Sequence, residues 1–157
     1  MRTVIQRVKR ASVRIGKRTT GQIGQGYLVL AGVKEGDGEK ESINLARKIL
    51  ELRVMADEED KMNKSIFDVK GEILVISQFT LYADTRRGRR PSFVKAARPE
   101  IAEKLIDKFI NELKKSGLRV EKGEFGAKME VELINDGPVT IILDSKENTS
   151  EVKPRFS

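Results

Sequence analysis

The chain has 157 residues, 38% of them hydrophobic, and its 31 Lys and Arg against 24 Asp and Glu give a formal net charge of +7. This length suffices for one sizeable hydrophobic core and is too short for two ordinary domains. The sequence contains no His and no Cys, which excludes Ser-His-Asp and Cys-His nucleophile systems, imidazole bases, disulfides and zinc sites built from these ligands.

The first third of the sequence alternates apolar and polar residues in the manner of β-strands. Asp37 is a candidate N-cap for a helix that runs to about Leu52. Extended chain is expected directly after this helix, and then a polar loop over 57–64. The strands expected before the helix cover 4–8, 12–15, 19–23 and 27–33, the last being apolar throughout and therefore buried on both faces.

The second half predicts a further apolar strand over 73–76 and the clearest helix of the chain, which begins at Pro99 and ends near a C-terminal cap at Gly117. Strands follow over 118–122, 129–133 and 139–143. Because strands and helices do not alternate strictly, we expect an α+β fold with a mostly antiparallel or mixed sheet, curled toward a barrel, and two main helices. The prediction is one compact domain over 1–145 and a polar tail over 146–157.

The segment Ser77-Gln78-Phe79-Thr80 lies where a buried strand leaves the sheet. Backbone N–H groups at such a point can stabilise a developing oxyanion without a charged side chain, and an enzyme without His or Cys needs groups of this kind. The alternative is that Ser77 and Thr80 merely terminate a strand while Phe79 belongs to the core.

Asn135-Asp136-Gly137-Pro138 has the composition of a turn. By local sequence it is best interpreted as a tight hairpin. A Gly-Pro bond can also adopt the cis form at modest cost, which redirects the neighbouring carbonyl groups.

The stretch 86–98 contains six basic residues and no acidic one. Together with the net positive charge, it predicts contact with phosphates of a polyanionic partner, although a solvated charged face would have the same composition. No apolar run approaches the roughly 18–20 residues that cross a bilayer, and the chain start lacks the apolar core of a secretion signal. We therefore expect a cytoplasmic protein that does not bind a membrane.

Taken together, these segments resemble the D-aminoacyl-tRNA deacylase family, formerly known for D-tyrosyl-tRNA, over nearly the whole chain. The pair of motifs at this separation is what makes the resemblance specific. The matching stretches are Met1-Arg2-Thr3-Val4-Ile5-Gln6-Arg7-Val8, Ala11-Ser12-Val13, Ser77-Gln78-Phe79-Thr80-Leu81, Arg89-Arg90-Pro91-Ser92-Phe93, Phe125-Gly126-Ala127-Lys128-Met129 and Asn135-Asp136-Gly137-Pro138-Val139-Thr140.

The resemblance implies a homodimeric hydrolase that cleaves the ester of D-aminoacyl-tRNA, and of glycyl-tRNA, and excludes L-aminoacyl-tRNA sterically with a Gly-cisPro pair from the partner subunit. It needs no cofactor or metal. The residues expected at the site are Ser77, Gln78, Phe79 and Thr80 for catalysis, Gly137, Pro138, Met129 and Phe125 for substrate binding and chiral selection, and Arg86, Arg87, Arg89, Arg90 and Lys95 for tRNA binding.

Two other functions remain open from the residues alone. A non-catalytic basic RNA-binding module rich in β-structure would explain the charge, but such modules stack bases on exposed aromatic residues, and aromatic residues make up only 5% of this chain. A structural or interaction protein with basic surfaces is the other. Neither alternative explains the two motifs.

Overall fold

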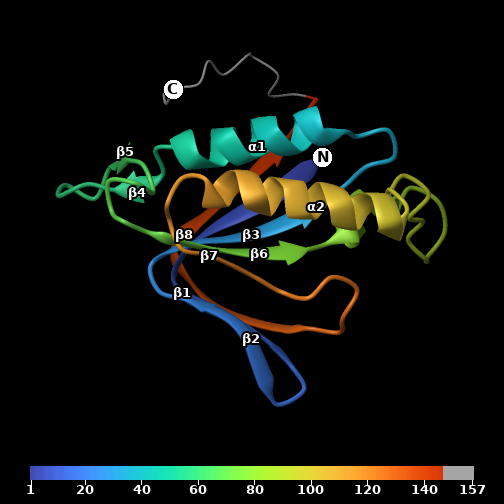
Figure 1. Cartoon of the computed structure of the whole chain (residues 1–157), viewed down its shortest axis with the longest axis horizontal. Helices are drawn as coiled ribbons and strands as arrows, with labels where there is room; N and C mark the ends of the chain where they lie inside the picture. The colour runs from blue at the N-terminus through green and yellow to red at the C-terminus, as the bar shows by residue number, and fades with distance from the viewer. Residues whose placement is uncertain (147–157) are drawn as a thin grey trace.

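The computed structural model describes residues 1–146. A six-stranded sheet with two helices on one of its faces accounts for most of this part of the chain (Figure 1). In chain order the elements are β1 (Arg2–Ile15), β2 (Arg18–Ile23), β3 (Gly26–Gly32), α1 (Glu39–Glu51), β4 (Met55–Ala56), β5 (Met62–Lys64), β6 (Glu72–Ser77), the 3-10 helix η1 (Phe79–Tyr82), α2 (Pro99–Lys114), β7 (Val120–Lys122) and β8 (Glu130–Asp144).

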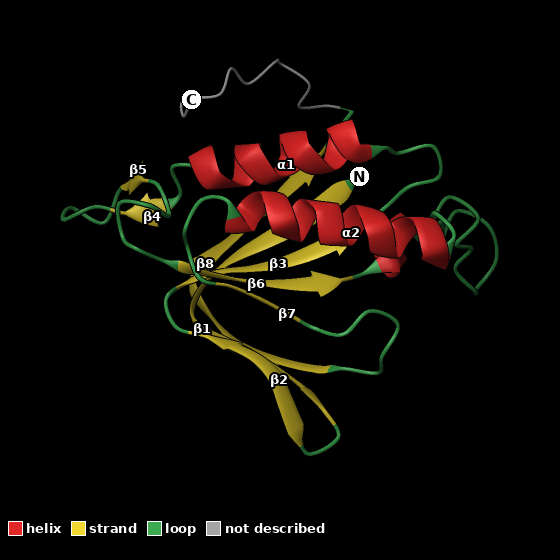
Figure 2. Cartoon of the chain, viewed as in Figure 1, coloured by secondary structure: helices red, strands yellow, loops and turns green. Residues whose placement is uncertain are grey.

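The sheet is mixed and strongly curled. Its strand order is β2-β1-β3-β6-β7, and β8 pairs with β1 as well. β1 is antiparallel to β2, β3 and β8, whereas β3, β6 and β7 run parallel to one another. The first half of β1 pairs with β3 and its second half with β2, so the sheet turns away from the helices there (Figure 2). The expected α+β fold with a barrel-like mixed sheet is confirmed.

The sheet has a hydrophobic core on each face. Side chains of successive residues in a strand point to opposite faces, and Tyr27 and Val29 of β3 belong to the core that also contains residues of α1 and α2, such as Ile49 and Phe109. Leu28, between them, packs in a smaller core on the other face with residues of β1, β2 and β6. The prediction that this strand is buried on both faces is therefore confirmed.

The start of α1 differs from the expectation. Gly38, not Asp37, is the N-cap, and the Glu41 carboxylate accepts a hydrogen bond from its N–H at 2.8 Å. The Asp37 carboxylate accepts from the N–H of Lys34 at 2.7 Å and pairs with the Met1 ammonium group at 2.5 Å. The prediction of Asp37 as the cap was wrong, because a buried ammonium group distant in sequence competes for the same oxygen.

The hairpin expected at residues 135–138 was also wrong, since β8 continues from Glu130 to Asp144. The Asn135 side chain accepts from the N–H of Val139 at 2.8 Å and donates to the Val139 carbonyl at 3.2 Å. These bonds span a bulge, where the pairing with β1 shifts register, and the peptide bond between Gly137 and Pro138 is cis.

Within residues 1–146, none of the helices is long and apolar enough to cross a membrane.

Candidate active site

Ser77-Gln78-Phe79-Thr80 lies at the carboxyl end of β6, as the sequence predicts, and continues into η1. The N–H of Gln78 donates to the Ala31 carbonyl of β3 at 2.8 Å. A Cβ atom on Gly32 would lie 2.8 Å from the Gln78 carbonyl oxygen, closer than packing permits. Glycine at this position therefore allows the motif to lie directly against β3.

A pocket of about 650 Å³ opens beside this motif. Ser77, Gln78 and Phe79 form part of its wall, and Phe125 and Met129, which precede β8, form another part. The structure thus brings together five residues that the sequence assigns to the site. The remaining wall residues are Ala31, Val33, Ile76, Phe93, Ala96, Ala97, Arg98, Pro99, Ala102, Ile106, Gly126, Ala127 and Val131.

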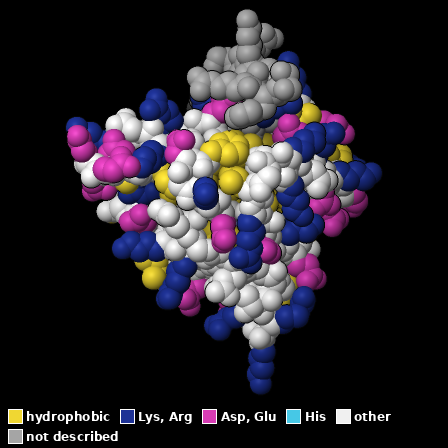
Figure 3. Space-filling model, turned by 60° about the vertical axis from the view of Figure 1, so that its left-hand side comes forward, with side chains coloured by type: hydrophobic (Ala, Val, Ile, Leu, Met, Phe, Trp, Pro, Cys, Tyr) yellow, Lys and Arg dark blue, Asp and Glu magenta, His cyan; other side chains and the backbone are white. Residues whose placement is uncertain are grey.

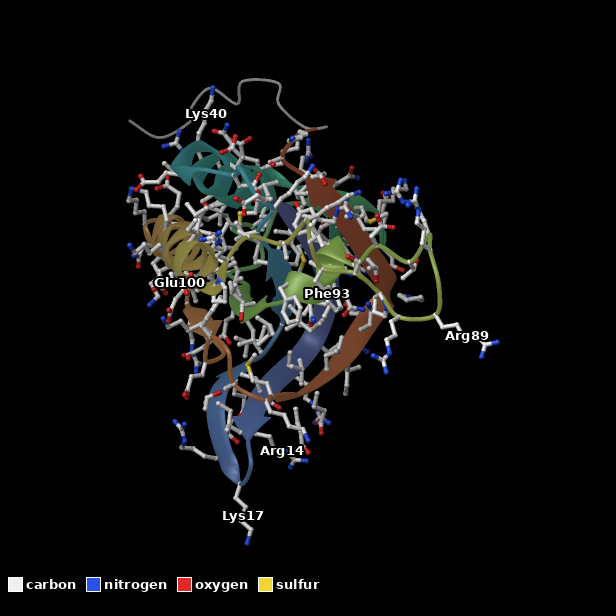
Figure 4. The ribbon with its side chains drawn as sticks, turned by 90° about the vertical axis from the view of Figure 1, so that its right-hand side faces the viewer. Arg14, Lys17, Lys40, Arg89, Phe93 and Glu100 are labelled. Carbon is white, nitrogen blue, oxygen red and sulfur yellow. The ribbon has the colours of Figure 1, made fainter. Side chains whose placement is uncertain are left out.

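Phe79 and Phe93 form an aromatic pair in the pocket wall. Their ring centroids are 5.0 Å apart and the ring planes meet at 70°, an edge-to-face contact. Phe79 keeps 57% of its surface exposed. Phe93 and Arg98 were missed as site residues, although Phe93 is the one aromatic residue within the basic stretch. Figure 4 shows Phe93 lying over the sheet while Arg89, from the same loop, points into solvent.

Thr80 does not belong to the pocket wall. Its hydroxyl accepts a hydrogen bond from the Gln78 side-chain amide. In the part of the chain that the structure describes, the N–H groups of Phe79 and Thr80 make no hydrogen bond, as expected for the first residues of a helical turn. The motif therefore offers two free amide donors.

Gly137 and Pro138 are exposed, and neither belongs to the wall of this pocket. The bulge that carries them is held from beneath by Arg7, which is only 8% exposed. Its Nε donates to the Asp136 carbonyl at 2.8 Å, and its Nη1 donates to the Val54 carbonyl at 2.9 Å. Arg7 was missed because a charged residue on an alternating strand is expected to face solvent, and its polar neighbours Gln6 and Lys9 give no sign of burial.

The basic stretch lies in the loop between η1 and α2. Arg86 is paired with Asp84 at 2.6 Å, and the Lys95 ammonium is 3.7 Å from the same carboxylate. The hydrogen bonds from Arg86 hold the pKa of Asp84 well below its usual range. Two of the five predicted tRNA-binding residues are thus already engaged with a carboxylate.

Arg87, Arg89 and Arg90 are exposed, and they form no ion pair within residues 1–146. The face of the molecule seen in Figure 3 is not uniformly basic like this loop, because Lys and Arg are interspersed there among Asp and Glu.

In the described residues, no group of three His, Cys, Asp or Glu side chains is placed to hold a metal ion.

Comparison with known proteins gives a consistent result. The family described as D-Tyr-tRNA(Tyr) deacylase matches residues 4–144. A D-aminoacyl-tRNA deacylase of Roseiflexus sp. (strain RS-1) is 59% identical over 145 residues, covering 92% of this chain and 94% of the relative. One of Thermosipho africanus (strain TCF52B) is 54% identical over 147 residues, covering 94% and 99%.

Two solved structures are also similar. A c-Myc DNA unwinding element binding protein has a TM-score of 0.86 at 44% identity, covering 92% of this chain and 98% of its own. A probable eukaryotic D-amino acid tRNA deacylase has a TM-score of 0.77 at 15% identity, covering 90% of this chain and 97% of its own, and shows a shared fold.

Proposed function

Because the chain belongs to the D-Tyr-tRNA(Tyr) deacylase family and is a D-aminoacyl-tRNA deacylase, a hydrolase, we propose a place for the reaction. The ester bond that joins the D-amino acid to the tRNA is cleaved in the pocket beside Ser77, Gln78 and Phe79. The observation that carries this proposal is that one pocket combines this motif with Phe125 and Met129. Its apolar wall suits the flat adenine ring and the amino-acid side chain of the substrate.

The chemistry depends on the free amide group of Phe79, which belongs to the pocket wall, and on that of Thr80, the next residue in the chain, at the edge of the pocket. Water adds to the ester carbonyl, the oxyanion accepts hydrogen bonds from these amides, and the bond to the ribose oxygen breaks as that oxygen takes up a proton. Each such donor is worth roughly 10²-fold to 10³-fold in rate, and an aminoacyl ester is already activated. The neighbouring ribose hydroxyl assists the proton transfer.

Thr80 acts in orientation and not as a covalent nucleophile. Its hydroxyl accepts from the Gln78 amide, and the chain contains no His that could remove its proton. Gln78 and Thr80 together fix the start of η1 and hence the direction of the amide groups.

Chiral selection requires a second copy of the chain. Gly137 and Pro138 are exposed and absent from the pocket wall of their own chain, so they reach a pocket only across a subunit interface. Within the described residues β8 pairs with β1 alone, and it exposes 41% of Ile134 and 66% of Ile142. This free, partly apolar strand suits a homodimer contact.

In such a dimer, the carbonyl groups beside Gly137 and Pro138 accept hydrogen bonds from the α-ammonium group of the substrate. With the ester carbonyl fixed as well, the two remaining substituents on the α-carbon are distinguished by space alone. An L side chain is excluded, a D side chain is accepted, and glycine passes because it has no side chain. Glycyl-tRNA is therefore a second substrate.

The tRNA lies along the basic loop, with Arg87, Arg89 and Arg90 as free phosphate partners and Arg86 and Lys95 beside them. Contacts to phosphates carry no base sequence, which suits an enzyme that clears many mischarged tRNAs in the cytoplasm.

The test is to incubate the purified protein with D-tyrosyl-tRNA and with L-tyrosyl-tRNA, and to measure how fast free tyrosine is released from each. We expect rapid release of D-tyrosine, slow or no release of L-tyrosine, and the same result in EDTA. Equal rates for both enantiomers would contradict the steric account of selection, and loss of activity in EDTA would contradict the account based on backbone donors.

A further inference from the structure

A second pocket, of about 250 Å³, lies at the opposite end of η1 from the active site. Gln78 and Phe79 border the active-site pocket, whereas Tyr82, the last residue of η1, borders this second one. The two pockets share no wall residue. The motif of the active site and the second pocket are thus connected by a single helical turn.

The second pocket is strongly basic. Among residues 1–146, four cations belong to its wall, from Arg2, Lys34, Lys95 and Lys146, against the one carboxylate of Asp144. Arg2 is paired with Asp144 at 2.9 Å, and the Lys95 ammonium lies 3.7 Å from the Asp84 carboxylate. Within residues 1–146, the ammonium groups of Lys34 and Lys146 form no ion pair. Cations gathered in this way repel one another unless an anion lies between them.

Tyr82 borders the pocket, but its hydroxyl is closed off from solvent. It is only 6% exposed, and its hydroxyl has no hydrogen-bond partner in the described part of the chain. Burial, more than the nearby carboxylates of Asp144 and Asp37, raises the pKa of Tyr82 above its ordinary value, so the hydroxyl keeps its proton.

We propose that this pocket binds a phosphate group and steadies the active-site turn. The guanidinium of Arg2 connects the pocket to the turn η1. Its Nη1 donates to the Leu81 carbonyl of η1 at 3.3 Å, and its Cζ lies 5.2 Å from the centre of the Tyr82 ring. The phosphate comes from the tRNA backbone or from a free phosphate ion. The first source rests on the proposed tRNA substrate, and the second does not.

Binding is tested without turnover. Inorganic phosphate is titrated into the protein at constant ionic strength while the amide resonances of Lys34, Tyr82 and Ala83 are followed by NMR. The variants are the double substitution Lys34→Gln with Lys146→Gln, and a control, Lys17→Gln, which removes an exposed lysine in the turn that follows the far end of β1 from Arg2 (Figure 4).

Saturable shifts in the wild-type protein and in Lys17→Gln, with at least tenfold weaker binding in the double variant, support the site. Equal binding by the double variant, or no saturable shift, overturns it, whether or not the protein hydrolyses D-aminoacyl-tRNA. A double variant with a changed oligomeric mass would instead assign these lysines to a subunit contact and also overturn it.

The source of the phosphate is identified by two substrates. If the tRNA backbone supplies it, the double variant loses about tenfold in kcat/KM on D-tyrosyl-tRNA and nothing on D-tyrosyl-adenosine, which lacks phosphates. If a free ion supplies it, inorganic phosphate changes the wild-type rate on D-tyrosyl-adenosine and leaves that of the double variant unchanged. Either pattern supports the site. If the wild-type protein and the double variant behave identically on both substrates, with and without inorganic phosphate, the proposal is overturned.

Discussion

Gly32 shows how the absence of one side chain sets the position of the proposed active-site motif, Ser77-Gln78-Phe79-Thr80. A Cβ atom there would lie 2.8 Å from the Gln78 carbonyl oxygen and 3.2 Å from the Leu81 Cβ. We expect Gly32→Ala to shift η1 and lower kcat/KM by at least about tenfold, a barrier change of ~1.4 kcal/mol. Gly24→Ala is the matched control, since its Cβ would meet nothing closer than 3.9 Å. Full activity of Gly32→Ala would show that the motif tolerates displacement.

Arg7 carries a prediction about chiral selection. Its two hydrogen bonds, to the Asp136 and Val54 carbonyls, come from different nitrogens of one planar group. Lysine keeps the charge but has no such fork, so Arg7→Lys should loosen the bulge that carries Gly137 and Pro138. The ratio of D-tyrosyl-tRNA to L-tyrosyl-tRNA hydrolysis should then fall.

The control is Arg10→Lys, because the Arg10 side chain is 64% exposed. A lower melting temperature of Arg7→Lys with an unchanged enantiomer ratio would limit Arg7 to a role in stability.

At the level of single residues, the sequence analysis located the Ser77–Thr80 motif correctly but found only some of the residues that lie around it. Ser77, Gln78, Phe79, Phe125 and Met129 do meet in one pocket, and each stands in a stretch with a recognisable pattern. Arg7 and Arg98 could not be found in this way. Their roles depend on which distant segments fold against them, such as Asp136, 129 residues from Arg7.

The two helices are tied by a half-buried ion cluster that gives a pH-dependent prediction. Glu112 of α2, 8% exposed, accepts from Lys115 at 2.7 Å and from Arg47 of α1 at 3.1 Å. The bond from Lys115, and then that from Arg47, lowers the pKa of Glu112 despite its burial. Because the folded-state pKa is depressed, this stabilisation is present above the unfolded pKa, near 4.3, and is lost as the pH falls through the folded-state value.

Glu112→Gln should therefore lower the free energy of unfolding at pH 7 by about 1–3 kcal/mol. The difference from the wild-type protein should shrink as the pH is lowered below ~4. Urea unfolding at a series of pH values measures this, with the exposed Glu103→Gln on the same helix as the control. A constant difference at all pH values would mean that the charge of Glu112 contributes nothing.

The elements themselves follow from local patterns, with two informative exceptions. Alternation and apolar runs predicted β3, β6 and both helices. Turn chemistry failed at Asn135–Val139, where a side chain replaces the missing backbone pairing and β8 continues. The prediction of a helix cap was wrong at Asp37, because its carboxylate pairs with the Met1 ammonium group. The pairing of β8 with β1 on both sides of Asn135, and the contact of Met1 with Asp37, join segments that short windows of sequence do not contain.

For the whole molecule, the proposed dimer predicts a mass of twice 17.7 kDa. Ile142 is 66% exposed on β8, and Ile142→Lys should shift the mass toward that of one chain, because a buried lysine without a partner is costly. Met62→Lys, at a residue 53% exposed on the small β4–β5 sheet, should leave the mass unchanged. Light scattering after size-exclusion chromatography measures both. A wild-type protein of 17.7 kDa would contradict the shared active site.

The charge of the molecule gives the last prediction, which concerns the salt dependence of tRNA binding. Arg87 and Arg90 are exposed and form no ion pair within residues 1–146, so they are free to replace counterions on phosphates. Substituting both with Ala should weaken binding to every tRNA and reduce the slope of log K against log salt by about 0.7–0.9 for each phosphate that the protein no longer neutralises. Lys40→Ala with Lys48→Ala, two basic residues on α1, removes the same charge elsewhere. If both double variants change the slope equally, the protein is attracted to tRNA by its net charge alone, and the basic loop is only a solvated face.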